Sequence, residues 1–311
     1  MPIVSIVVPA KNQQSYIYEC LSSLINQKYK NLDIIVIDDQ SSDATRGIAQ
    51  KFSDNRIRII DGPGKGFSAS LNTGLFNAVG DIVMQCDADD RYPEDRVAKQ
   101  VAWLAINPDF DAVCGAYYSM DQNGKIVSRL ALYEKESEIS DELRNGITRT
   151  SLCTFAMRAH AMKKVHGLRE YFPTSGDIDF QLRFGDINRV FYRPDFTYFY
   201  RIHDASITHT QPSPLRQFYE ATAHRFQQQR KERGYDDLQT GSPPTPPDNQ
   251  HAKANSARQQ IQEFMTGEAW RMHKEGRKRD ALKISLQLVK NNSFDQNTWR
   301  NLLLLLVKKA R

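Results

Sequence analysis

The sequence has few cysteines and no long apolar run, and both shortages limit what the protein can be. Its four cysteines show no C-x-x-C spacing, so we expect buried thiols in a reducing compartment rather than disulfides or a zinc site. The densest apolar run, from Leu302 to Val307, is far shorter than the ~20 residues of a membrane-spanning helix. The N-terminal residues lack a basic segment and reach a proline at Pro9, which argues against a secretory signal. We therefore expect a cytoplasmic protein.

Charge is unevenly distributed along an otherwise ordinary globular composition. The 311 residues suit one large α/β domain with a smaller appendage. Residues 251–311 hold 13 Lys and Arg against 5 Asp and Glu, whereas residues 1–250 hold 29 against 32. A solvated helical face is the simpler interpretation of this basic tail, and peripheral contact with the inner face of a membrane is the other. We expect no nucleic-acid partner.

The first part of the chain alternates short apolar segments with segments of helical periodicity. Strands are predicted at residues 3–8, 32–37, 57–60 and 82–85, and helices at residues 16–25, 44–52, 68–78 and 93–107. This alternation predicts a doubly wound parallel sheet. In such a sheet ligands bind beyond the carboxyl ends of the strands, so acidic residues that follow strands become candidates for the site.

The pattern changes after residue 110. Apolar segments at 112–118, 126–127 and 151–157, with a turn at Asn123-Gly124, predict mixed or antiparallel strands. Residues 241–250 are rich in proline and predict a linker. We therefore expect a mixed α/β domain at residues 1–240 and a small all-helical appendage at residues 251–311, which resembles a partial tetratricopeptide-type repeat.

The strongest chemical signal is the cluster Asp87-Ala88-Asp89-Asp90, which follows the predicted strand at 82–85. Carboxylates this close repel one another unless a cation neutralises them. Their hard oxygen atoms suit Mg²⁺ or Mn²⁺, which would bridge phosphates and stabilise charge on a departing nucleoside diphosphate. The structural alternative is a solvated acidic loop that caps the next helix.

Two further segments add candidate ligand contacts. Asp38-Asp39 ends another predicted strand, where a carboxylate accepts hydrogen bonds from a ribose or a base imide. Lys65 lies in the glycine-rich segment Gly62–Gly66, as either a phosphate contact or an ordinary surface lysine. That segment is a weak dinucleotide fingerprint and does not fit the Walker pattern, because Gly66 follows Lys65.

Taken together, these segments resemble the family 2 inverting glycosyltransferases of GT-A fold, over residues 2 to about 210. The resemblance rests on four ordered motifs: Pro9-Ala10-Lys11-Asn12, Asp38-Asp39, Lys65-Gly66 with Asn72-Thr73-Gly74, and Asp87-Ala88-Asp89-Asp90. It implies a Rossmann-like doubly wound mixed sheet. It also implies that Pro9, Lys11 and Asp39 face the base of a nucleotide sugar. Asp87 and Ala88 would face its ribose and phosphates, and Asp89 would bind Mn²⁺ or Mg²⁺.

Later segments extend the resemblance. Asp177, before Asp179, maps to the family's catalytic base, because inverting displacement needs a carboxylate opposite the leaving diphosphate. The alternative is that Asp177 caps a helix that begins near Asp179. His203, in a Tyr-Arg-x-His segment, maps to a second metal ligand. Two positions depart from the family pattern, because Gly176 replaces a glutamate and Leu71 replaces an arginine. A Gln-x-x-Arg-Trp segment is also missing, which favours a non-processive bacterial type.

The sequence therefore predicts a metal-dependent inverting transferase. It would move sugar from a UDP-, dTDP- or GDP-sugar to the hydroxyl of a glycan or lipid-linked acceptor, in surface polysaccharide or glycoconjugate synthesis. One alternative is a sugar nucleotidyltransferase, although the glycine- and arginine-rich loop of those enzymes is not found after the first strand, where Ala10 to Gln13 stand. Another is a non-catalytic protein that acts through its helical tail.

Overall fold

The computed structural model describes residues 1–130, 135–206, 213–248, 256–274, 276–291 and 293–308. These residues form two compact units. The first unit comprises the described residues of 1–117, 131–200 and 211–252, and the second those of 118–130, 201–210 and 253–311. Residues 242–248 have no regular secondary structure. The domain boundaries predicted from the sequence, with a catalytic domain at residues 1–240 and a linker at residues 241–250, stay a prediction.

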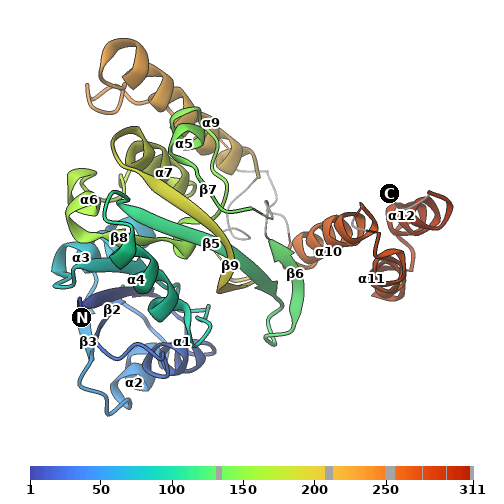
Figure 1. Cartoon of the computed structure of the whole chain (residues 1–311), viewed down its shortest axis with the longest axis horizontal. Coiled ribbons are helices and arrows are strands. Elements are labelled where there is room, and N and C mark those ends of the chain that lie inside the picture. The colour runs from blue at the N-terminus through green and yellow to red at the C-terminus, as the bar shows by residue number, and fades with distance from the viewer. Residues whose placement is uncertain (131–134, 207–212, 249–255, 275, 292, 309–311) are drawn as a thin grey trace. The chain divides into compact units, whose positions relative to one another are not determined.

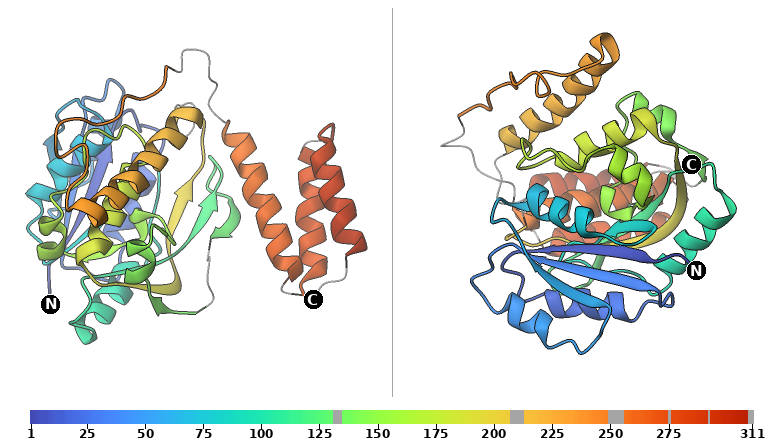
Figure 2. Two further views of the ribbon diagram at one scale, coloured as in Figure 1. Left: turned by 90° about the horizontal axis from the view of Figure 1, so that it is seen from above. Right: turned by 90° about the vertical axis from the view of Figure 1, so that its left-hand side faces the viewer.

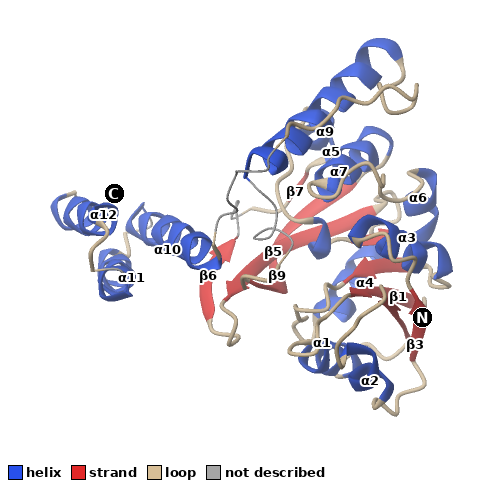
Figure 3. Cartoon of the chain, turned by 180° about the vertical axis from the view of Figure 1, so that it is seen from behind, coloured by secondary structure: helices blue, strands red, loops and turns tan. Residues whose placement is uncertain are grey.

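A mixed sheet forms the centre of the first unit, and its strands appear in red in Figure 3. Its order is β3-β2-β1-β4-β8-β5-β9-β7, and β6, which like the last residues of β5 belongs to the second unit, pairs with β5 outside this path. The strands are β1 (Val4–Ala10), β2 (Leu32–Asp38), β3 (Ile57–Asp61), β4 (Ile82–Gln85), β5 (Ala112–Met120), β6 (Ile126–Leu130), β7 (Ser137–Glu138), β8 (Ala156–Arg158) and β9 (Val190–Arg201). The first four pair in parallel, whereas β8 is antiparallel to both β4 and β5. The expected doubly wound mixed sheet is confirmed.

Helices cover both faces of this sheet because its central strands are apolar on both sides. Along β1, Val4, Ile6 and Val8 belong to one buried cluster and Val7 to the other. The first cluster includes residues of α1 (Ile17–Ile25), α2 (Thr45–Gln50) and α4 (Arg96–Ile106). The second includes residues of α3 (Phe67–Asn77), α5 (Ser140–Arg144), α6 (Ala159–Lys164) and α7 (Gly176–Ile187). The right view of Figure 2 shows α3 above the blue strands and α2 below them.

The end of β1 accommodates a proline where a central strand normally excludes one. Residues Val4–Val7 pair with β4, but the pairing with β2 continues to Ala10. Pro9 therefore lies beyond the part of β1 that has a neighbour on both sides, so its missing N–H breaks no ladder. Beyond Val7, β1 no longer pairs with β4, and β1 ends at the same edge of the sheet as β2 and β4.

Two segments differ from the sequence prediction. Residues 151–157, expected as a strand, form the 3₁₀ turn η1 (Leu152–Thr154) followed by the three-residue strand β8. The helix α9 (Ser213–Arg233) was not predicted. It is polar overall, and its buried apolar side chains Tyr219, Ala223 and Phe226 pack beside Phe172. Figure 1 shows α9 next to α7.

The second unit contains three helices of the C-terminal region, namely α10 (Ala257–Lys274), α11 (Lys278–Asn291) and α12 (Gln296–Val307). They lie side by side in the left view of Figure 2, and α10 also contacts β6. The expected C-terminal helical appendage is thus confirmed. Within the described part of the chain, no helix has the length and apolar character needed to cross a bilayer.

Candidate functional site

The acidic segments selected from the sequence meet at one edge of the sheet. Strands β1, β2 and β4 are parallel neighbours, so their carboxyl ends lie together. Lys11 follows β1, Asp39 follows β2, and Asp87 follows β4. The fold therefore gathers side chains that are up to 76 residues apart in sequence, from Lys11 to Asp87.

Asp39 holds the glycine-rich loop in place. Its carboxylate is buried and accepts hydrogen bonds from the backbone N–H groups of Gly64 at 2.7 Å and Gly66 at 3.1 Å. Lys11 Nζ lies 3.9 Å from the same carboxylate. A Cβ at Gly62 would lie 2.7 Å from the Asp39 Cα, which is closer than real side chains approach. The glycine at position 62 is therefore required by the close approach of the two loops.

The remaining residues of this edge have different environments. Pro9 is buried at the end of β1 and Ala88 is buried between Asp87 and Asp89 of the acidic cluster, whereas Lys65 is exposed on the glycine-rich loop. Lys65 is thus accessible to a ligand, and its role as a phosphate contact stays a prediction. The same applies to the predicted base contacts of Pro9 and Lys11.

Asp87 is the most strongly perturbed acid of the edge. Its Oδ1 accepts a hydrogen bond from Gln85 Nε2 at 2.7 Å, and its backbone N–H donates to the Tyr198 hydroxyl at 2.9 Å. Burial and, to a smaller extent, the negative charges of Asp89 and Asp177 together raise the pKa of Asp87 to about 7, although the hydrogen bond from Gln85 opposes the increase. The charges of Asp89 and Asp177 therefore both act on Asp87, although Asp177 is far away in sequence.

Asp177 enters the site from α7. It is the second residue of that helix, which begins at Gly176 rather than near Asp179, so Asp177 lies in the first turn. Burial raises the pKa of Asp177, while hydrogen bonds from backbone N–H groups at Asp177 and Ile178 oppose the increase. A carboxylate with a raised pKa in a partly buried position is a stronger proton acceptor than one in water. Capping and proton acceptance are therefore compatible at this residue.

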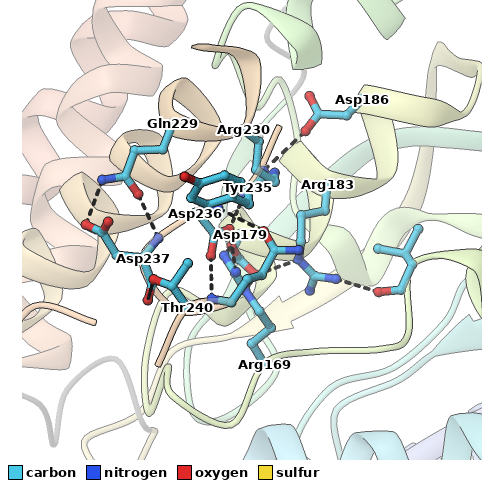
Figure 4. A network of polar contacts seen from close by, with 12 residues as sticks. Arg169, Asp179, Arg183, Asp186, Gln229, Arg230, Tyr235, Asp236, Asp237 and Thr240 are labelled. Atoms are coloured by element: carbon cyan, nitrogen blue, oxygen red, sulfur yellow. Dashed lines mark hydrogen bonds and ion pairs between the residues drawn. The ribbon is translucent and has the colours of Figure 1, made fainter. Parts of the chain in front are cut away.

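A buried network of ion pairs fixes α7 (Figure 4). Asp179, fully buried, accepts two hydrogen bonds from Arg169 and one from Arg183 Nε at 2.9 Å. Arg169 Nη1 also pairs with Asp236 at 2.7 Å, which links α7 to the segment after α9. Although burial opposes the change, Arg169 and Arg230 lower the pKa of Asp236. Because Asp179 is two residues from Asp177, this network anchors the helical turn that carries the candidate base.

The two departures from the family pattern have structural correlates. Leu71 is buried in the apolar cluster that also contains Leu75, so no cation is presented from this position of α3. At Gly176, a Cβ would lie 3.3 Å from both the Phe172 Cβ and the Ser68 Oγ. A larger residue there would require its neighbours to shift by a few tenths of an ångström. Gly176 therefore fits the packing between α3 and the loop before α7.

The predicted metal ligands lie in different units. Asp89 follows β4 in the first unit, and His203 is a buried residue of the second. Among the residues that the structure describes, no three His, Cys, Asp or Glu side chains converge on one metal position. Two carboxylates as close as Asp87 and Asp89 nevertheless fit a hard cation, because Mg²⁺ is usually held by one or two carboxylates and substrate phosphates.

The structure also reveals contributors that the sequence did not single out. Tyr198 lies in the aromatic segment to which no role was assigned, yet its hydroxyl contacts the backbone of Asp87. Its ring lies 5.7 Å from that of Tyr92, and the Arg96 guanidinium lies over both rings. The hydroxyl of a buried tyrosine usually has a hydrogen-bond partner. A tyrosine in an apolar strand could therefore have been identified from the sequence as a candidate for such a contact.

Comparison with known proteins supplies the family. The family model described as "Glycosyl transferase family 2" matches residues 5–166. Glycosyltransferase GlyA of Streptococcus pneumoniae is 37% identical over 122 residues, which cover 39% of this chain and 17% of that protein. An uncharacterized glycosyltransferase of Rickettsia typhi, RT0329, is 29% identical over 228 residues, covering 70% of this chain and 69% of its own length. The match thus covers only a small part of the first relative and about two thirds of the second.

Solved structures agree on the fold. The crystal structure of S. aureus TarS 1-349 in complex with UDP-GlcNAc aligns with a TM-score of 0.62 at 18% identity, over 98% of this chain and 79% of that one. The mannosyltransferase PcManGT from Pyrobaculum calidifontis, in complex with GDP-Man and Mn²⁺, aligns with a TM-score of 0.54 at 17% identity, over 98% and 84%. Together with the family match, these likenesses identify the fold as GT-A. The chain belongs to glycosyl transferase family 2.

Proposed function

We propose that this protein is a metal-dependent inverting glycosyltransferase that moves one sugar from a nucleotide diphosphate sugar to an acceptor hydroxyl. The observation that carries the proposal is that the negative charges of Asp89, after β4, and of Asp177, on α7, both act on Asp87. A purely structural acidic loop has no need of a third carboxylate from a separate helix. A site for donor and acceptor does need one, because the diphosphate and the reacting hydroxyl lie on opposite sides of the sugar.

Asp177 is the proposed base. As the acceptor oxygen bonds to the anomeric carbon, the bond from that carbon to the diphosphate oxygen breaks. The hydroxyl proton passes to the Asp177 carboxylate, and the electron pair leaves with the nucleoside diphosphate. The raised pKa of Asp177 brings its basicity closer to neutral pH, where general-base catalysis is most effective.

Asp89 is the proposed metal ligand, with His203 as a second one implied by the family resemblance. A bound Mn²⁺ or Mg²⁺ supplies positive charge that stabilises the departing diphosphate. The proximity of Asp87 to Asp89 supports this proposal, because their two negative charges repel each other and a bound cation would remove this repulsion. The structural neighbour PcManGT, in complex with GDP-Man and Mn²⁺, is consistent with it.

The donor is proposed to lie along the carboxyl ends of β1, β2 and β4. Pro9, Lys11 and Asp39 would contact the base, Asp87 and Ala88 the ribose and phosphates, and Lys65 a phosphate. Asp39 accepts hydrogen bonds from the glycine-rich loop, so a base would either add to these contacts or displace them. Neighbours in complex with UDP-GlcNAc and GDP-Man support a UDP-, dTDP- or GDP-sugar as the donor class.

The wider context follows from the same family. We propose a glycan or lipid-linked acceptor and a role in surface polysaccharide or glycoconjugate synthesis. The basic tail, with 13 Lys and Arg against 5 Asp and Glu in residues 251–311, favours a cytoplasmic protein with peripheral contact at the inner membrane face. No feature of the site favours nucleic acid.

The test separates donor binding from chemistry. Wild type, Asp177→Asn and the control Asp141→Asn are compared for Mn²⁺-dependent stabilisation by nucleotide sugars and for donor hydrolysis, in which water replaces the acceptor. Asp141 is a matched control because it also lies in the first turn of a helix, α5. We expect Asp177→Asn to keep donor binding and to lose about 100-fold or more in turnover. Unchanged turnover in Asp177→Asn would remove the proposed base.

Two experiments address the metal and the alternative functions. Asp89→Ala and His203→Ala should weaken the effect of Mn²⁺ on donor binding, whereas Asp109→Ala, an exposed aspartate in a turn, should not. Release of pyrophosphate instead of nucleoside diphosphate would favour a sugar nucleotidyltransferase. Partner capture by the tail without any turnover would favour a non-catalytic protein.

A further inference from the structure

The outer face of α12 presents a row of apolar side chains to solvent. Trp299 is 46% exposed, Leu303 59%, Leu306 49% and Val307 82%. Their spacing of four, three and one residues places them on one side of the helix. We call these four residues the α12 stripe.

The α12 stripe is not part of the core of the second unit. Leu302 and Leu305, which lie on the same helix outside the stripe, are buried, and α12 packs against α11. The indole of Trp299 is oriented by a hydrogen bond from its Nε1 to the Ser293 carbonyl at 2.8 Å. A contiguous apolar row that is exposed to this extent marks a surface for binding.

The charged residues of α12 and of the segment after it are all basic, and Asp295, directly before the helix, accepts hydrogen bonds from the Asn297 N–H and from Gln262. From Gln296 to Arg311 the sequence contains no Asp or Glu, whereas Arg300 and Lys308 are exposed beside the stripe. A second copy of the chain would match the apolar residues but would bring only more positive charge. A bilayer with anionic headgroups complements both properties. Trp and Leu with flanking Lys and Arg are typical of helices that lie in the membrane interface.

We propose that the α12 stripe is a docking surface for an anionic lipid bilayer. The four apolar side chains would lie at the boundary of headgroups and acyl chains, and Arg300 and Lys308 would contact headgroup phosphates. This inference names the surface behind the membrane contact in the proposed function. It concerns lipid binding alone, so its failure would leave the proposed sugar transfer unaffected.

The test uses the full-length protein with vesicles of phosphatidylglycerol or of phosphatidylcholine. We expect sedimentation with the first and not with the second, and a shift of tryptophan emission to shorter wavelength that is lost in Trp299→Phe. The double variant Leu303→Ser/Leu306→Ser should bind at least about tenfold more weakly. Ile106→Ser, which changes an isoleucine that is 80% exposed on α4, should bind like the wild type.

A charge variant separates the two contributions. Arg300→Gln/Lys308→Gln should bind anionic vesicles about tenfold more weakly at low salt, whereas Lys51→Gln, on the first unit, should not. Equal binding to both lipids would overturn the proposal, as would absence of vesicle binding. If the wild type instead self-associates and Leu303→Ser/Leu306→Ser is monomeric, the α12 stripe is an interface between copies. Circular dichroism of each variant excludes loss of folding as the cause.

Discussion

The ion-pair network that contains Asp179 of α7 allows a quantitative prediction for the stability of Asp179→Asn. The substitution removes the charge that pairs with Arg169 and Arg183 but keeps the size of the side chain. Asp179 is fully buried and its two partners are mostly buried, so the change leaves two guanidinium groups with too little negative charge. Breaking a buried pair costs roughly 3–5 kcal/mol. Because Arg169 retains Asp236, we expect the lower end, about 3 kcal/mol.

Asp186→Asn is the matched control, since Asp186 lies on the same helix and belongs to the outer part of the same network. It pairs with Arg230 at 3.2 Å and its side chain is 23% exposed. Solvent screens this pair, so we expect a loss of about 1 kcal/mol or less. Both variants are compared with the wild type by urea denaturation and by thermal melting. A loss of about 3 kcal/mol corresponds to a decrease in melting temperature of about 6 °C or more.

The functional consequence distinguishes positioning from general stability. At a temperature where all three proteins are folded, Asp179→Asn should retain donor binding but hydrolyse donor more slowly, because Asp177 is displaced. Small misplacements of a catalytic group cost up to about 100-fold. If Asp179→Asn loses no more stability than Asp186→Asn, or if turnover is unchanged, the network does not position the base.

Three more predictions follow from the edge of the sheet. Folding raises the pKa of Asp87 from 3.8 to about 7, so in metal-free protein the protonated form of this carboxyl stabilises the folded state. This contribution to the free energy of unfolding is complete below about pH 4 and is lost as the pH rises through about 7. The urea-derived free energy of unfolding should therefore fall by about 2 kcal/mol more in wild type than in Asp87→Asn between about pH 5 and about pH 8, and parallel pH profiles would contradict this. Gly62→Ala should weaken UDP-sugar binding, measured by calorimetry, because its Cβ would displace Asp39, whereas Gly47→Ala, with open space around it, should not. Tyr198→Phe removes the acceptor for the Asp87 N–H and should cost about 1 kcal/mol in thermal or urea unfolding with slower donor hydrolysis; wild-type values for both would refute the role of this contact.

The first part of the fold and its site could be predicted from the sequence because each strand and helix there has a clear local pattern of apolar residues. Strands β1, β2 and β4 are continuous apolar runs, and acidic or basic residues follow them directly. In a parallel sheet, strand ends meet, so the proximity of Lys11, Asp39 and Asp87 follows from the order of the elements alone. Local pattern and tertiary arrangement thus agree in this region.

Other features depend on contacts that no local pattern records. Residues 151–157 are apolar because they are buried, and burial alone does not distinguish a 3₁₀ turn from a strand. The helix α9 is mostly polar and buries only a few side chains, so its apolar pattern is weak. The pairing of Asp179 with Arg169 joins positions ten residues apart through a loop. The sequence does not show which arginine will form an ion pair with a given aspartate.

The central claim is that the protein cleaves a nucleotide sugar between the sugar and the diphosphate. It is tested most directly by incubating the protein with Mn²⁺ and a panel of UDP-, GDP- and dTDP-sugars, and measuring nucleoside diphosphate and pyrophosphate in the same samples. The account predicts nucleoside diphosphate from at least one donor, no product after chelation of the metal, and at least about 100-fold slower release by Asp177→Asn. Pyrophosphate as the product, or no nucleoside diphosphate from any donor, would contradict it.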